Sequence, residues 1–324
     1  MIHAIIIPIL MGFSIFLCGM KLMELALHRL TGPRLLDALH SSTATPLHGL
    51  AMGTVSTALL QSSTAVTVIT IGLVNARLLS FPRTLGIVLG TNIGTCLTTE
   101  LIGLNIHALA VPLLIGSFGT WLLTALFKEM RLLPRIGQSA WLETSRSASV
   151  AVCGFGMLLA GLTIMQSIGP AVEQSALFDW FMARSANSLL WGVAAGTALT
   201  AAVHSSSAVI GLVMGFATIG AMPLDVGISI ILGANIGTCV TAMLASIGGS
   251  RGGKLVALTH FVLNVGGAIL FLPFAGELAA AAEWLSHSPA SSIAHAQTIY
   301  NVACSLLALP VCYLPFWRKL QNTV

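Results

Sequence analysis

A stretch of this sequence occurs twice, and the duplication limits the folds that the chain can adopt. The first copy covers residues 53–98, and the second follows 143 positions later, at 196–241. The segments at the ends of the two copies, 89–98 and 232–241, share eight identical residues of ten. Both copies should therefore build the same local structure within one fold.

The composition places these copies in a membrane. Only 7% of the 324 residues are charged, 56% are hydrophobic and the mean hydropathy is +0.94. So few charges cannot cover a soluble globule, and the apolar runs reach the roughly 20 residues that a membrane-spanning helix needs. Alternating apolar and polar residues, as in a membrane β-barrel, are absent from the sequence. The sequence predicts an all-α polytopic membrane protein.

A polar break interrupts an apolar segment in each copy. Gln-Ser-Ser-Thr at 61–64 lies near the centre of the apolar segment 47–77, and His-Ser-Ser-Ser at 204–207 lies near the centre of 187–220. A straight membrane helix would place these side chains close to the bilayer midplane. The alternative is a re-entrant hairpin, in which two half-helices enter and leave by the same face and the polar tip is buried in protein.

Charge placement favours the hairpins. Basic residues flank the first apolar segment on both sides: Lys21, Arg29, Arg34, Arg77 and Arg83. Both of its ends thus have the positive charge that is typical of cytoplasmic segments, and a hairpin satisfies this pattern whereas a single crossing does not.

The same rule gives a topology of about seven transmembrane helices and two re-entrant helical hairpins in the inner cell membrane. It has a first repeat at 1–127 with its hairpin at 47–77, a basic cytoplasmic loop at 128–146, a second repeat at 147–275 with its hairpin at 187–220, and a final helix with a short cytoplasmic tail at 276–324. Polar connectors are expected at 28–46 and around Arg184.

In this topology the N-terminus is outside and the C-terminus is cytoplasmic. Thirteen of the 14 basic residues are cytoplasmic, the exception being Arg184. Each repeat contributes three crossings, an odd number, so the second repeat is inverted relative to the first.

Inverted repeats with interrupted helices are typical of secondary transporters, whose substrate site lies where the interruptions meet. Serines in each break are good N-caps for the second half-helix, whose free N–H groups and partial positive charge suit an anion. The topology puts no Lys or Arg at midplane depth, so co-bound cations would have to balance the anion. Candidate substrate ligands are Gln61, Ser62, Ser63, Thr64, Asn92, His204, Ser205, Ser206, Ser207 and Asn235.

Hydroxyl and freed carbonyl oxygens near the breaks can also coordinate sodium. In the two Asn-Ile-Gly-Thr elements, glycine permits a helix break and asparagine offers both a donor and an acceptor. The candidate sodium ligands are Thr67, Thr95, Thr98, Thr238 and Thr241. The alternative is that these hydroxyls bond to their own backbone and that the glycines serve only close helix packing.

Other polar residues have open roles. His204 is a ligand, a proton carrier or a buried histidine with satisfied hydrogen bonds. Glu100 is expected at a helix boundary, and His107, His260 and Asn264 are expected in helix packing. The six cysteines all lie in apolar segments without metal-ligand spacing, and packing roles are expected for them: Cys18, Cys96, Cys153, Cys239, Cys304 and Cys312.

The two breaks, Gln-Ser-Ser-Thr-Ala-Val-Thr and His-Ser-Ser-Ser-Ala-Val, each precede a Gly-x-Asn-Ile-Gly-Thr element. This double motif, together with residues 12–23 and 257–264, resembles the type II sodium/phosphate cotransporter family. The resemblance implies that the breaks bind phosphate and that neighbouring hydroxyls bind sodium. His204 replaces the usual glutamine, and Ile210 stands where the first copy has Thr67, which puts one cation site in doubt.

The sequence therefore predicts a secondary active transporter that carries inorganic phosphate into the cell with sodium by alternating access. Its partners are phosphate, sodium and the bilayer, with no nucleic acid and no cofactor besides the coupling ions; the oligomeric state stays open. The alternatives are transport of another oxyanion, phosphate export, or an anion channel or membrane-embedded sensor. An enzyme is disfavoured because the sequence has no nucleophile–base pair, metal cluster or nucleotide motif.

Overall fold

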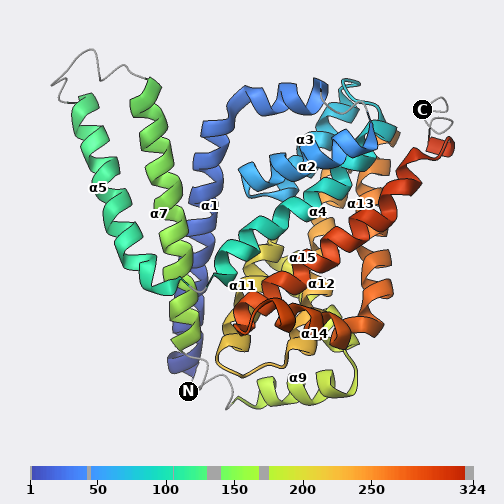
Figure 1. Ribbon diagram of the computed structural model, residues 1–324. Helices are drawn as coiled ribbons and strands as arrows, with labels where there is room; N and C mark the ends of the chain where they lie inside the picture. Colours follow the sequence, from blue (N-terminus) through green and yellow to red (C-terminus); the bar gives the residue numbers. More distant parts are fainter. Residues whose placement is uncertain (1, 42–44, 105, 130–139, 168–174, 318–324) are drawn as a thin grey trace. The chain divides into compact units, whose positions relative to one another are not determined.

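The computed structural model describes residues 2–41, 45–104, 106–129, 140–167 and 175–317, and within these ranges all regular structure is helical (Figure 1). Within the described ranges, seven helical segments are long and apolar enough to cross a membrane: Ile7–Thr31, Phe81–Gly103, His107–Lys128, Ala140–Ser167, Leu224–Ala245, Arg251–Leu285 and Pro289–Tyr313. The predicted class, an all-α polytopic membrane protein, is confirmed.

The α-helices follow in chain order as α1 (Ile2–Ser41), α2 (Pro46–Leu60), α3 (Ser63–Asn75), α4 (Phe81–Gly103), α5 (Ala110–Glu129), α7 (Ala140–Ser167), α9 (Ala176–Asn187), α10 (Leu190–Val203), α11 (Ser206–Thr218), α12 (Leu224–Ala245), α13 (Arg251–Phe271), α14 (Ala275–Leu285) and α15 (Pro289–Ala308).

Three of these helices cover residues that were expected in connectors. α1 continues through most of the predicted connector 28–46, and α9 occupies the segment around Arg184. α7 begins at Ala140, inside the predicted basic loop 128–146, of which residues 130–139 lie outside the described residues.

The chain forms two compact units, of which the first contains Met1–Gly32 and Ile106–Val172. Here α1 and α7 pack through glycines. A Cβ on Gly12 would lie 2.8 Å from the carbonyl oxygen of Gly161, and a Cβ on Gly19 would lie 2.5 Å from that of Gly154. Gly12, the first glycine of this pair in α1, thus faces Gly161, the second in α7, and Gly19 faces Gly154. The two helices therefore run antiparallel with their backbones in contact.

The sequences around these glycines are themselves related. Residues 12–23 and 154–165 share the pattern Gly-Phe-x3-Leu-x-Gly-x3-Met. The duplication therefore includes α1 and α7. In the interface between these two related helices, each helix makes with its two glycines the same contacts that the other helix makes.

The second unit contains Pro33–Asn105 and Glu173–Val324, and its helix contacts occur in pairs. α2 packs on α4 as α10 packs on α12, and α4 packs on α15 as α12 packs on α13. Likewise, α3 contacts α13 and α12, whereas α11 contacts α15 and α4. The two copies thus have equivalent neighbours, with α13 and α15 in corresponding places.

The glycines of the Asn-Ile-Gly-Thr segments allow close packing and do not break their helices. α4 and α12 continue through both segments, so of the two roles that these glycines permit, a helix break or close packing, the structure shows close packing. A Cβ on Gly90 would overlap the carbonyl oxygen of Leu50, and one on Gly233 would overlap that of Val193. Without a Cβ, these positions let α4 touch α2 and α12 touch α10 while each helix keeps its own hydrogen bonds.

Candidate functional site

The two polar breaks have the same backbone conformation. α2 ends at Leu60 and α3 starts at Ser63, and the equivalent break separates Val203 from Ser206. Gln61 and His204, which end the first half-helices, have φ angles of 53° and 58° in the left-handed region. This region is unfavourable for residues other than glycine, and each copy adopts it at the same place.

Each second half-helix begins with a serine cap. Ser62 Oγ accepts from the N–H of Ala65 at 3.2 Å, and Ser205 Oγ accepts from the N–H of Ala208 at 3.2 Å. The prediction of N-caps is confirmed for Ser62 and Ser205, whereas Ser63 and Ser206 are the first helical residues and not caps. The first N–H groups of a helix have no partner within that helix, so both starts can bind an anion.

The two breaks differ in what their first residue contacts. Thr98 Oγ1 donates to Gln61 Oε1 at 2.8 Å, and Gln61 Nε2 donates to the Ala58 carbonyl at 2.5 Å. His204 is exposed, and its side chain makes no hydrogen bond within the described ranges. Thr241, the equivalent of Thr98, donates to the Thr238 carbonyl at 2.8 Å instead. Thr98 therefore ties Gln61 to the neighbouring long helix, whereas Thr241 makes no such hydrogen bond to His204.

All predicted ligands belong to the second unit, and most of them are buried or half-buried in it. Buried candidates are Ser63, Thr67, Asn92, Thr95, Thr98, Ser206, Ser207, Asn235 and Thr238. Half-buried candidates are Gln61, Ser62, Thr64, Ser205 and Thr241.

Among the predicted sodium ligands, four threonine hydroxyls donate a hydrogen bond to another described residue and that of Thr67 does not. Thr95 and Thr238 donate to the carbonyls of Thr91 and Ala234, at 2.9 and 3.0 Å, which leaves their oxygen lone pairs available. The hydroxyl of Thr67 is buried and makes no hydrogen bond to any described residue.

The structure does not join the two breaks by any hydrogen bond among the described residues. It connects them indirectly, because α3 packs against α12 and α11 packs against α4. Each second half-helix thus touches the long helix of the other copy. On those helices Asn92 Nδ2 donates to Asn264 Oδ1 at 3.1 Å, whereas Asn235 Nδ2 donates to the Ile231 carbonyl of its own helix at 3.0 Å.

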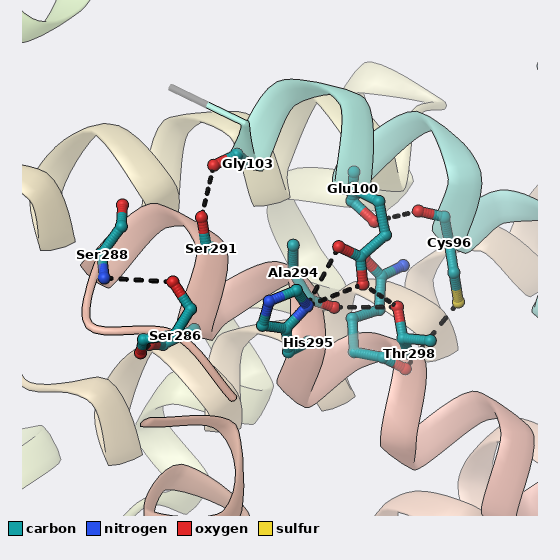
Figure 2. Close-up of polar contacts among 12 residues, drawn as sticks. Cys96, Glu100, Gly103, Ser286, Ser288, Ser291, Ala294, His295 and Thr298 are labelled. Carbon is teal, nitrogen blue, oxygen red and sulfur yellow. Dashed lines mark hydrogen bonds and ion pairs between the residues drawn. The ribbon is translucent and has the colours of Figure 1, made fainter. Parts of the chain in front are cut away.

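A further polar cluster lies at the end of α4 (Figure 2). The carboxylate of Glu100 accepts from Thr298 Oγ1 at 2.5 Å and lies 3.0 Å from His295 Nδ1. Ser291 Oγ donates to the Gly103 carbonyl at 2.6 Å. Glu100 was expected at a helix boundary and is in the last turn of α4. Its partners on α15 were missed, since nothing in the sequence pairs residues almost 200 positions apart.

The fold and the breaks define a class: an integral membrane protein with duplicated helices that are interrupted at matching, serine-capped positions. A sequence model of the Na+/Pi-cotransporter family matches residues 15–167 and 173–286, and the chain belongs to this family. The family is one of transporters, and membership confirms the resemblance seen in the motifs.

Individual relatives agree with this assignment. The "Uncharacterized protein YqeW" of Bacillus subtilis is 35% identical over 306 residues, which are 94% of each chain. The "Putative inorganic phosphate export protein YjbB" of Escherichia coli is 26% identical over 94% of this chain, which spans only 53% of YjbB. The human "Sodium-dependent phosphate transport protein 2C" is 39% identical over 83 residues, 24% of this chain and 14% of its own. No solved structure matches the chain.

Proposed function

We propose that this protein is a secondary active transporter that moves inorganic phosphate into the cell together with sodium by alternating access. The observation that carries the proposal is the pair of serine-capped helix starts at Ser62 and Ser205. Membership of the Na+/Pi-cotransporter family supports phosphate as the substrate.

The two helix starts provide what a phosphate needs from a site whose predicted ligands include no Lys or Arg. Each offers first-turn N–H groups, which have no partner within their own helix, and the positive end of a helix dipole, which stabilises an anion by about 0.3–1 kcal/mol and by up to about 2 kcal/mol when partly buried. Hydrogen bonds to a charged group add about 1.5–3 kcal/mol each. The serine, threonine and amide groups of the two breaks can supply such bonds to one tetrahedral anion.

Sodium provides the charge balance. Phosphate brings one or two negative charges into a site whose predicted ligands include no Lys or Arg, so co-bound cations should strengthen its binding. Threonine oxygens near the breaks are suitable ligands, with Thr67 the best placed because its buried hydroxyl is unused by the described chain. The Thr98–Gln61 hydrogen bond links this region to the first phosphate-binding break.

The lengths of the half-helices support breaks within the membrane. α2 has 15 residues and α3 has 13. At a rise of 1.5 Å per residue, 15 residues extend about 22 Å, less than the roughly 30 Å of the hydrocarbon core. We therefore propose that α2–α3 and α10–α11 are re-entrant hairpins whose tips hold the substrate.

The antiparallel packing of α1 and α7 supports inverted repeats, because these two helices share a sequence pattern. An inverted pair of repeats gives the protein two conformations of similar energy, each open to one side. In the orientation that the charges favour, the N-terminus is outside and residues 128–146 and the C-terminus are cytoplasmic.

Export is the second candidate function, because the YjbB relatives are named as phosphate export proteins. A symporter follows the inward sodium gradient of the cell and imports phosphate. An exporter driven by sodium would instead exchange sodium that enters the cell for phosphate that leaves it.

Labelled phosphate uptake into proteoliposomes separates these functions. Sodium on the same side as phosphate should drive accumulation above the external level, while potassium or a proton gradient alone should not. Stimulation only by sodium on the opposite side would support exchange and hence export. No phosphate movement under any of these gradients would refute the proposal, and a series of oxyanions tests the substrate.

A further inference from the structure

Two amide side chains at the centre of α15 are buried without using all of their hydrogen-bonding atoms. Gln297 and Asn301 have exposed fractions of 0% and 1%. Gln297 Oε1, Gln297 Nε2 and Asn301 Oδ1 make no hydrogen bond to any residue that the structure describes. The two residues are four positions apart and so share one face of the helix. A buried polar atom without a partner is unfavourable, and a bound ligand would offset this cost.

α15 and α13 each contact a cysteine of a long helix in the same way, so α13 provides a comparison for α15. Cys96 Sγ lies 3.9 Å from the Gln297 carbonyl and 3.4 Å from Asn301 Nδ2. Cys239, which is the equivalent of Cys96 in the second copy, lies 3.5 Å from the His260 carbonyl and 3.4 Å from Asn264 Nδ2. Gln297 and Asn301 therefore correspond to His260 and Asn264.

The two places differ in whether the asparagine oxygen is used. Asn264 Oδ1 accepts from Asn92 Nδ2 at 3.1 Å. The equivalent donor for Asn301 would be Asn235, whose amide bonds to the Ile231 carbonyl of its own helix. The oxygen of Asn301 is left open, and Gln297 adds a second open oxygen where α13 has an imidazole.

Two of the three open atoms, Gln297 Oε1 and Asn301 Oδ1, are oxygens, and these suit a small monovalent cation. Neutral amide oxygens are hard ligands, as in known sodium and calcium sites, and an imidazole nitrogen is not. One turn beyond Cys96 on α4 lies Glu100, which is bonded to His295 and Thr298 of α15 (Figure 2). Its carboxylate makes the local potential more negative and so favours a cation over an anion.

We propose that Gln297 and Asn301 provide oxygen ligands of a sodium site between α15 and α4, separate from the threonine hydroxyls near the breaks. The family match ends at residue 286, so it assigns no role to α15. The role of this site in coupling depends on the proposed symport, but its cation binding does not. Because α15 also packs against α11, which starts at the second break, a sodium ion held here stabilises the contact between α15 and the helices that carry the phosphate site.

Binding of radiolabelled sodium to the purified protein without phosphate tests the site directly. Substitution of Gln297→Met with Asn301→Leu removes both oxygens at similar side-chain volume and should lower the number of sodium ions bound per chain by one. Asn264→Leu, at the equivalent position on α13, is the control and should leave that number unchanged. An unchanged sodium count in the double variant overturns the proposal.

A second variant keeps the test decisive if the double substitution prevents folding. Asn301→Asp preserves the shape and adds a charge, so it should tighten sodium binding at least tenfold; unchanged sodium affinity also overturns the site. The outcome is independent of the proposed function. If the wild-type protein does not transport phosphate but the double variant still loses one bound sodium ion, only the symport proposal is refuted. If symport is intact and the double variant binds as many sodium ions as the wild type, only this site is refuted.

Discussion

Gln61 combines a strained backbone with a side chain that belongs to the proposed phosphate site, and two substitutions separate these properties. Its φ of 53° costs a residue with a Cβ roughly 1–2 kcal/mol relative to glycine. Its side chain makes two hydrogen bonds, from Thr98 and to the Ala58 carbonyl, which contribute about 1 kcal/mol each. Gln61→Ala keeps the strain and loses both bonds, whereas Gln61→Gly loses both bonds and relieves the strain.

The free energy of unfolding should therefore be about 1–2 kcal/mol higher for Gln61→Gly than for Gln61→Ala, with the glycine variant within about 1 kcal/mol of wild type. Phosphate uptake should fall at least tenfold in both variants, because both lack the amide. Thermal unfolding in detergent and uptake into proteoliposomes measure the two effects on the same preparations.

Arg77 provides the matched control. It has a φ of 60° and lies beyond the end of α3, away from the break. Arg77→Gly should gain about 1 kcal/mol of stability without changing uptake. Wild-type uptake by Gln61→Gly would refute the role of the amide in transport, and equal stability of the glycine and alanine variants would refute the strain argument.

Three further substitutions test other parts of the structure. Ser62→Ala with Ser205→Ala should abolish uptake and lower the free energy of unfolding by about 2 kcal/mol, about 1 for each lost cap; unchanged uptake by this inserted variant would contradict the proposed site. Gly19→Leu should abolish stable folding, measured by the yield of monodisperse protein, since its side chain would overlap the backbone of α7; Gly116→Ala has open space around it and should behave as wild type. His204→Gln should preserve or improve uptake if the histidine replaces the glutamine ligand; a loss of uptake or of its pH dependence would instead favour a proton carrier.

The parts of the site that depend on neighbouring residues could be predicted from the sequence. A serine after a helix end and before an apolar run is a local signal, and it correctly gave the caps at Ser62 and Ser205. The duplication strengthened this prediction, because the same signal at matched positions in both copies is hard to attribute to chance.

The parts that depend on distant residues could not be predicted. Glycine in a membrane helix permits either a break or a close helix contact, and only the position of α2 decides that Gly90 serves the contact. The partners of Asn92 and Glu100 lie on α13 and α15, at separations of 172 and 195 residues. Such pairs follow from helix packing, which no local pattern in the sequence specifies.

In the proposed transporter, the two breaks together hold one phosphate. Titration calorimetry of phosphate into the purified protein, in sodium and then in choline, tests it most directly. We expect one phosphate bound per chain in sodium only, with binding lost in Ser62→Ala and in Ser205→Ala alike. Two phosphates per chain, or full affinity in either single variant, would contradict this expectation.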